Sequence, residues 1–320
     1  MSSLPRVVLL AGGGGGARLA RGFTGLLQQV APLVVTNPGD DFEHLGLLVC
    51  PDTDSVLYAV SDAIDPTRGW GRCDESWGVL EEIKRLGGPG WFSLGDRDIA
   101  LHLMRRAGLA AGKTLTEVTH DLLARLGVEG LPVIPASDQS VQTVVHSTDG
   151  VMAFQEYFVT RGCAPQIKEL EYRGAEKARP NGALLSFMAA GCDCVILGPS
   201  NPYLSLAPIL SISGMVEALS QVGVIAAVSP IVGGDAIKGP LAKIMGEKGL
   251  QPTAASWANE MKKMYPNLIN LWVLDVADAE CAEQMRAGGD TVLVCETVMT
   301  NSKHKEALAQ RIVTEALRRD

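Results

Sequence analysis

Hydrophobic positions along the chain follow two different periods, and their order predicts alternating strands and helices. Residues 5–11 are typical of a strand buried on both faces, with an uninterrupted apolar run over residues 7–11, and residues 17–27 follow with helical spacing. A second apolar run ends at Thr36, before helical spacing over residues 54–64. Beyond Asn181, further apolar runs alternate with helical segments, at residues 192–197, 222–228, 271–274 and 291–295. This order predicts an α/β fold with a Rossmann-like, doubly wound, mainly parallel sheet.

The middle of the chain departs from this rhythm. Helical periodicity covers residues 77–86, 96–106 and 115–126, and the last segment follows a capping box formed by Thr114 and Glu117. Residues 141–146 and 151–158 alternate on either side of Thr148-Asp149-Gly150, which indicates a β-hairpin. We therefore expect an α/β core formed by residues 1–60 and 181–320, with residues 61–180 as a helical and hairpin insert over one rim.

Composition narrows the class of protein. With 320 residues, of which 47% are hydrophobic and 20% charged, the chain can bury a large core. A formal net charge of −8 argues against a non-specific nucleic-acid-binding surface, which needs stripes of Lys and Arg. No apolar run approaches the ~20 residues of a membrane-spanning helix, and the N-terminus lacks the cationic region and cleavage site of a signal peptide. We expect a cytoplasmic protein without nucleic-acid or membrane partners.

Five consecutive glycines, Gly12 to Gly16, stand between the first predicted strand and the helix that follows it. At this place backbone N–H groups and the helix dipole can receive a phosphate, and a side chain would block its approach. The alternative is a tight turn packed closely against a neighbour. The run fits G-x-G-x-x-G loosely, and no P-loop Gly-Lys-Ser/Thr follows. We predict that Gly12, Gly13, Gly15 and Gly16 contact a phosphate or diphosphate in a nucleotide-binding core.

A group of acidic residues follows the second predicted strand. That strand ends in Thr36-Asn37, without the Asp or Glu that a dinucleotide dehydrogenase uses to hold ribose hydroxyls. The acids come later in the chain, as Asp40, Asp41, Asp52 and Asp54. Such a cluster of hard oxygen ligands suits Mg²⁺ bridging a diphosphate. The alternative is that these acids cap helix N-termini or stabilise turns, which Asp52 or Asp54 can also do.

Two further polar segments are candidates for substrate contact. In residues 93–98, Asp96 could cap the following helix and Arg97 could reach a phosphate. After the strand at residues 192–197, Ser200 and Asn201 offer donors and acceptors that suit a base or ribose, although a plain turn explains them as well. Lys238 or Lys243 could lie near a diphosphate.

Several of these motifs, in the same order, resemble those of the 2-phospho-L-lactate transferase family, the deazaflavin transferases of coenzyme F-420 biosynthesis. The matching residues include Gly12-Gly13-x-Gly15-Gly16-Ala17-Arg18, Asn37-x-Gly39-Asp40-Asp41, Pro51-Asp52-x-Asp54, Ile64-Asp65, Gly69-Trp70-Gly71, Leu94-Gly95-Asp96-Arg97-Asp98, Pro135-x-Ser137-Asp138, Phe154-Gln155-Glu156, Gly198-Pro199-Ser200-Asn201-Pro202 and Ser229-Pro230-Ile231. Two positions depart from the family pattern. Gly14 stands where relatives often have Thr, and Ser93 stands where they are often basic or polar.

The resemblance implies transfer of a phospho-acid group from a guanosine diphosphate adduct to the ribityl hydroxyl of 7,8-didemethyl-8-hydroxy-5-deazariboflavin (Fo), with release of GMP. It implies that Asp40, Asp41 and Asp52 hold Mg²⁺ and that Asp54 meets the ribityl chain and accepts its proton. Substrate contacts are expected from the glycine run and from Ser93, Arg97, Gly198, Ser200, Asn201 and Lys238.

Alternatives to this interpretation differ in class. Regulators of the gluconeogenesis-factor type bind nucleotide sugars without catalysis, but they typically carry Gly-Gly-Ser-Ser after the paired acids, where this chain has residues 42–46 as Phe-Glu-His-Leu-Gly. An NAD-dependent oxidoreductase would bind nicotinamide. The transferred acid is left open among phospholactate, phosphoenolpyruvate and phosphoglycerate units. A homodimer is expected because dimers are the commonest oligomers.

Overall fold

The computed structural model describes residues 4–236 and 239–318, so the predicted contact Lys238 lies outside the described residues. A parallel sheet of seven strands runs through the molecule in the order β14-β13-β10-β9-β1-β2-β5. Its strands are β1 (Arg6–Ala11), β2 (Ala31–Thr36), β5 (Val133–Pro135), β9 (Cys194–Leu197), β10 (Val224–Val228), β13 (Leu271–Leu274) and β14 (Val292–Val294). The predicted α/β fold with a doubly wound parallel sheet is confirmed.

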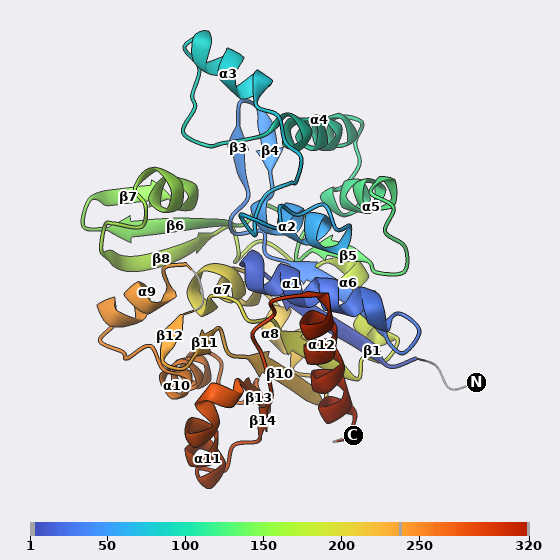
Figure 1. Cartoon of the computed structure of the whole chain (residues 1–320), viewed down its shortest axis with the longest axis vertical. Helices are drawn as coiled ribbons and strands as arrows, with labels where there is room; N and C mark the ends of the chain where they lie inside the picture. Colours follow the sequence, from blue (N-terminus) through green and yellow to red (C-terminus); the bar gives the residue numbers. More distant parts are fainter. Residues whose placement is uncertain (1–3, 237–238, 319–320) are drawn as a thin grey trace.

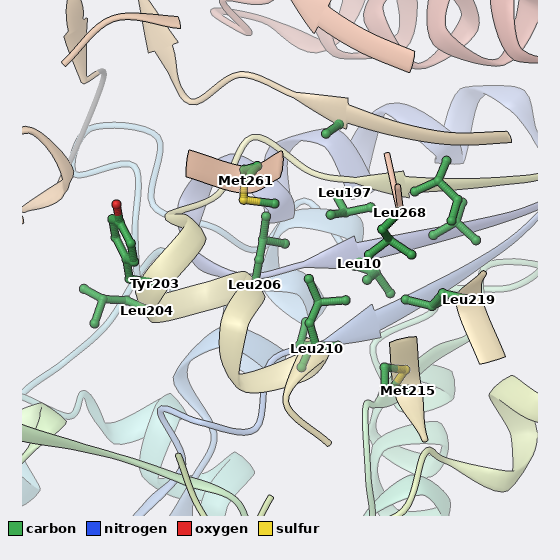
Figure 2. Close-up of a cluster of buried hydrophobic side chains, with 14 of the residues drawn as sticks. Leu10, Leu197, Tyr203, Leu204, Leu206, Leu210, Met215, Leu219, Met261 and Leu268 are labelled. Carbon is green, nitrogen blue, oxygen red and sulfur yellow. The ribbon is translucent and has the colours of Figure 1, made fainter. Parts of the chain in front are cut away.

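Each face of the sheet carries its own hydrophobic core, because successive strand residues point to opposite sides. In β1, Val8 and Leu10 belong to one core, and Val7 and Leu9 belong to the other. Figure 2 shows part of the first core, in which Leu10 and Leu197 lie near Leu206. Helices on this face are α6 (Gly182–Ala189), α7 (Ala207–Leu210), α8 (Met215–Leu219), α9 (Leu241–Glu247), α10 (Ala254–Met264) and α11 (Ala279–Ala287).

The second face is covered by helices from distant parts of the chain. They are α1 (Gly13–Phe23), α2 (Pro51–Val60), α5 (Leu115–Arg125) and α12 (Ser302–Leu317). The capping box predicted for Thr114 and Glu117 is present at the start of α5. No helix in the described ranges is both long and apolar enough to span a membrane.

The chain order places the topological switch point of the sheet between β1 and β9. From β1 the chain adds β2 and β5 on one side of the sheet, and later it adds β9, β10, β13 and β14 on the other side. In open α/β sheets, ligands bind outside the carboxyl ends of the strands where the order reverses in this way. The glycine run follows β1 and the turn at residues 198–201 follows β9, so both lie at this switch point.

A short hairpin of β11 (Ile231–Val232) and β12 (Asp235–Ala236) follows β10. The other strands and α-helices follow the carboxyl ends of β2 and β5. They are the hairpin β3 (Phe42–His44) and β4 (Leu47–Val49), helices α3 (Gly78–Arg85) and α4 (Asp96–Ala110), and an antiparallel sheet of β6 (Gln142–Ser147), β7 (Gly150–Ala153) and β8 (Ile167–Arg173). In Figure 1 the hairpin, α3 and α4 form one end of the long axis, above β6 to β8.

Three predicted boundaries differ from the structure. The predicted insert, residues 61–180, contributes β5 to the central sheet, because its short apolar run Val133–Pro135 pairs with β2. Helix α1 begins at Gly13 rather than residue 17, since the glycines form its first turn. The expected strand over 151–158 ends at Ala153. Phe154 and Phe158 stack instead across a helical turn, with ring centroids 5.5 Å apart, because side chains four residues apart meet on a helix.

Candidate active site

Close packing explains much of the glycine run. An added Cβ would lie 2.5 Å from the Cβ of Ser205 at Gly12, and 2.0 Å from the carbonyl oxygen of Pro199 at Gly15. At Gly16 it would lie 2.8 Å from a backbone atom of Ala11. Gly14 has no atom within 4 Å of such a Cβ. The alternative of a tightly packed turn therefore accounts for three of the glycines and leaves Gly14 facing open space.

The turn after β9 is joined directly to the glycine run. The Ser200 hydroxyl donates to the carbonyl oxygen of Gly12 at 2.7 Å, and Ser200 is buried. The Asn201 side-chain oxygen accepts bonds from Tyr203 N and Leu204 N and so caps the helical turn η3 (Pro202–Leu206). The Asn201 Nδ2 group is buried and has no hydrogen-bond partner within the described residues. The structure thus brings Gly198 and Ser200 to the glycine run, and the expected contacts of Gly198, Ser200 and Asn201 with substrate stay predictions.

Asn37 links two of the predicted carboxylates. Its Nδ2 donates to Asp52 Oδ2 at 2.8 Å, to Asp40 Oδ1 at 3.0 Å and to the Leu204 carbonyl at 3.2 Å. Asp52 Oδ1 accepts from Gly13 N at 2.7 Å. Asn37 belongs to the motif Asn37-x-Gly39-Asp40-Asp41 but was not predicted to hold the carboxylates. Its position at the end of β2 was the signal for this role.

Burial and mutual repulsion raise the proton affinity of this carboxylate pair. Burial, followed by the charge of Asp52, raises the pKa of Asp40 well above its usual range. Burial raises the pKa of Asp52 to about 6, against the lowering effect of the hydrogen bonds from Asn37 and Gly13. Two acids held beside one amide therefore lack a compensating positive charge in their direct contacts.

Asp54, by contrast, is already paired. It lies in the first turn of α2, and Arg105 of α4 donates through Nη2 to its Oδ1 and through Nη1 to its Oδ2, the latter at 3.2 Å. Cys50 N also donates to Asp54 Oδ2, at 3.3 Å. Arg105 is 0% exposed. Arg105 was not among the predicted site residues, because an Arg in a helical segment is usually solvated.

Asp41 occupies a third environment. Burial raises the pKa of Asp41 well above its usual range, while a hydrogen bond from the Cys50 thiol lowers it. Its Oδ1 atom is buried without a hydrogen-bond partner in the described part of the chain. Asp41 is thus separate in its contacts from the Asp40 and Asp52 pair, which share Asn37.

The residues fit a magnesium ion for which water molecules and phosphate oxygens supply most of the ligands. Within residues 4–236 and 239–318, no three His, Cys, Asp or Glu side chains converge on a point that could hold a metal ion, so the predicted set of Asp40, Asp41 and Asp52 does not form a three-carboxylate site. Mg²⁺ is commonly bound by one or two carboxylates together with substrate phosphates. Asp40 and Asp52 supply such a pair of hard oxygen ligands.

Ser93 and Arg97 lie on the exposed side of the insert. The Arg97 guanidinium has Asp74 as its ionic partner, at 3.9 Å, rather than a residue of the acidic cluster. Asp96 was expected to cap its own helix, but it accepts from Gly78 N and Val79 N and so caps α3. Glu75 caps α4 in return, because the helix N-termini lie side by side.

The chain is similar to known proteins over nearly its whole length. The family model described as 2-phospho-L-lactate transferase CofD matches residues 7–315. The chain belongs to this family. It is 38% identical over 316 residues to a protein named phosphoenolpyruvate transferase from Streptomyces griseus, with 96% of each chain covered. It is 33% identical over 308 residues to a 2-phospho-L-lactate transferase from Methanococcoides burtonii, covering 96% of this chain and 98% of that one.

A solved structure shares this fold. A crystal structure of a UPF0052 family member from Bacillus halodurans superposes with a TM-score of 0.64, covering 98% of this chain and 100% of that chain. The two sequences are 17% identical, so this similarity concerns the fold alone. Family membership makes the chain a transferase and decides against the predicted alternatives of a non-catalytic regulator and an NAD-dependent oxidoreductase.

In this CofD family member, the buried Asp52 should make stability fall as pH rises. The folded protein binds the Asp52 proton more tightly than the unfolded chain, since its pKa is about 6 against 3.8 when exposed. Its contribution is therefore fully favourable below about pH 4 and is lost as pH rises through 6. Each pKa unit corresponds to about 1.4 kcal/mol. In urea unfolding without divalent cations, wild type should lose on the order of 3 kcal/mol relative to Asp52→Asn between pH 4 and 8. The same pH dependence of the free energy of unfolding in wild type and Asp52→Asn would contradict this prediction.

Proposed function

We propose that this CofD family member transfers a phospho-acid group from a guanosine diphosphate adduct to the ribityl hydroxyl of Fo, in coenzyme F-420 biosynthesis. The ribityl oxygen forms a bond to the phosphorus distal to guanosine, the bond from that phosphorus to the bridging oxygen breaks, and GMP leaves. The hydroxyl proton is released and a phosphodiester remains. The observation that carries the proposal is the buried Asp40 and Asp52 pair beside the N-terminus of α1, at the switch point between β1 and β9.

The donor would lie across this switch point. The first-turn amides of Gly14 and Gly15 have no intrahelical acceptor, and a helix N-terminus favours phosphate. On the β9 side, the unpartnered Asn201 amide offers a donor to guanosine or its ribose. These two features support placing the diphosphate at the glycine run and the nucleoside at residues 198–201.

Magnesium would join the donor to the carboxylate pair. When bound, Mg²⁺ neutralises the negative charge that phosphoryl transfer develops on phosphate oxygens. Asp40 and Asp52 would hold it, and Asn37 would keep both carboxylates oriented through its amide group. Phosphoryl transfer depends mainly on positioning and electrostatic stabilisation, so this arrangement needs no covalent enzyme intermediate.

The acceptor has a suitable pocket beside the same acids. A pocket of about 250 Å³ adjoins Asp40, Asp41 and Phe42, and its other lining residues are Gly39, Gln142, Thr143, Val144, Val151, Met152, Ala153, Phe154, Gln155 and Arg173. Phe42 also packs edge to face on Phe92, with ring centroids 4.8 Å apart. The apolar side chains of this lining suit the faces of a flat ring system such as a deazaflavin, and its charged and amide side chains suit the polar edge of that ring and the ribityl chain. We place the ring of Fo here, with its ribityl chain directed toward the carboxylates.

The transferred acid is proposed to be the phosphoenolpyruvate unit. Relatives named phosphoenolpyruvate transferase from Streptomyces griseus and Kitasatospora aureofaciens are both 38% identical to this chain. Relatives named 2-phospho-L-lactate transferase from Methanococcoides burtonii, Haloarcula marismortui and Methanosarcina mazei are 31–35% identical. The predicted homodimer and cytoplasmic location stay predictions.

A direct transfer assay tests the function. Incubation with Fo, Mg²⁺ and the phosphoenolpyruvate adduct of guanosine diphosphate should increase the mass of the deazaflavin by one phospho-acid unit and release GMP. The phospholactate and phosphoglycerate adducts, in separate reactions, should give at least about tenfold lower kcat/KM, because a pocket that hydrogen-bonds one acid discriminates against another by 1.4 kcal/mol or more. No mass gain with any donor would overturn the proposed function, and faster transfer of phospholactate would overturn the donor assignment.

A further inference from the structure

A buried arginine joins the insert to the acid-bearing helix of the core. Arg105 lies on α4 and is 0% exposed. Its Nη1 donates to the Leu48 carbonyl of β4 at 3.1 Å and to Asp54 Oδ2 of α2 at 3.2 Å, and its Nη2 donates to Asp54 Oδ1. One guanidinium therefore ties together three elements that border the acidic cluster.

The surroundings of Arg105 hold its side chain in one orientation. His102 Nδ1 lies 3.0 Å from Arg105 Nη1, and burial lowers the pKa of His102 to about 4, so a neutral His102 accepts that hydrogen bond. Arg105 also lies close enough to Asp41 to lower the pKa of that carboxyl. The guanidinium thus meets a direct carboxylate partner on one side, a neutral imidazole on another, and a second acid nearby.

The ion pair of Arg105 and Asp54 gives Asp54 a different environment from Asp40 and Asp52. Asp40 and Asp52 share an amide and have no positive charge in their direct contacts, whereas the charge of Asp54 is compensated by Arg105. A carboxylate that is compensated in this way is a poor metal ligand but a well-fixed hydrogen-bond acceptor. Its two oxygens are held by a planar fork of donors, which sets both their position and their orientation.

We propose that Arg105 is a positioning residue for the acceptor: it fixes the Asp54 carboxylate in the geometry that receives the ribityl hydroxyl of Fo. The inference rests on the proposed function. It predicts that Arg105 acts on the acceptor and leaves binding of the nucleotide donor unaffected. If Arg105 served only to stabilise the fold, its substitution would change the KM for Fo and the KM for the donor alike. In protein that is still fully folded, it would change neither.

The test compares Arg105→Lys with Arg106→Lys. Lys keeps the charge next to Asp54 but cannot make the two-pronged contact, whereas Arg106 is exposed on the same helix. In steady-state assays at 25 °C, Arg105→Lys should raise the KM for Fo at least about tenfold and lower kcat, which corresponds to about 1.4 kcal/mol or more. The KM for the guanosine diphosphate adduct should stay within about twofold of wild type, and Arg106→Lys should match wild type in both constants.

Each outcome decides the inference. Folded Arg105→Lys with an unchanged KM for Fo, or with both KM values raised equally, would show that Arg105 does not position the acceptor. If Arg105→Lys does not fold, Arg105→Gln takes its place, because Gln keeps a donor toward Asp54 but cannot make the two-pronged contact. An Fo-specific rise in KM then supports the inference and a wild-type KM refutes it. Absence of transfer to Fo by wild type itself would overturn the proposed function, and this inference with it.

Discussion

Asp52→Asn is expected to lower the magnesium-dependent kcat/KM for transfer by about 100-fold or more, with the fold retained. The substitution is nearly isosteric, but it removes one of the two charges beside Asn37 and replaces one acceptor oxygen by a donor. Asp52 Oδ1 also accepts from Gly13 N, so the amide side chain must give up either this bond or the one from Asn37. Loss of a catalytic group typically costs 10²–10⁴ in rate.

The measurement is a steady-state assay at saturating Mg²⁺, with circular dichroism to confirm folding. Asp40→Asn should behave similarly, because Asp40 shares the same Asn37 amide. Asp149→Asn, on the exposed turn of the β6–β7 hairpin, serves as the matched control and should retain wild-type activity. Rates within about threefold of wild type for both Asp52→Asn and Asp40→Asn would show that this pair does not carry the reaction.

The sheet was predictable from the sequence because its strands are buried on both faces. Strands such as β13 (Leu271–Leu274) are uninterrupted apolar runs, and the structure keeps the predicted bounds of that strand unchanged. Predicted helix and strand boundaries were wrong where tertiary contacts override the conformational preference of the local sequence. Glycine is a poor helix former, yet Gly13 to Gly16 begin α1, since the carbonyl of Pro199 leaves no room for a side chain at Gly15.

The site was only partly predictable, for a different reason. Asp40 and Asp52 stand out in the sequence as acids near the end of a strand, and the structure brings them together through Asn37. Arg105 lies fifty-one positions from Asp54 in the chain, and no local pattern marks an arginine that is going to be buried. Partners of that kind depend on how the insert folds back on the core, and periodicity carries no information about that packing.

The glycine run should separate into positions that tolerate a methyl group and positions that do not. In Gly15→Ala the new Cβ would lie 2.0 Å from the Pro199 carbonyl oxygen, a backbone atom that can move only if β9 or α1 shifts. Overpacking of this kind costs roughly 3 kcal/mol. We expect urea unfolding to show a loss of that size. We also expect transfer activity to fall at least about 100-fold, because β1 and β9 would be forced apart.

Gly14→Ala is the matched control, one residue away in the same helical turn. Its Cβ would meet no atom within 4 Å, and Ala favours a helix over Gly by up to about 1 kcal/mol. The variant should therefore be at least as stable as wild type in urea unfolding. If Gly14→Ala keeps its stability but loses affinity for the guanosine diphosphate adduct, the donor phosphates lie against Gly14 itself. If Gly15→Ala is as stable as wild type, close packing is not the reason for that glycine.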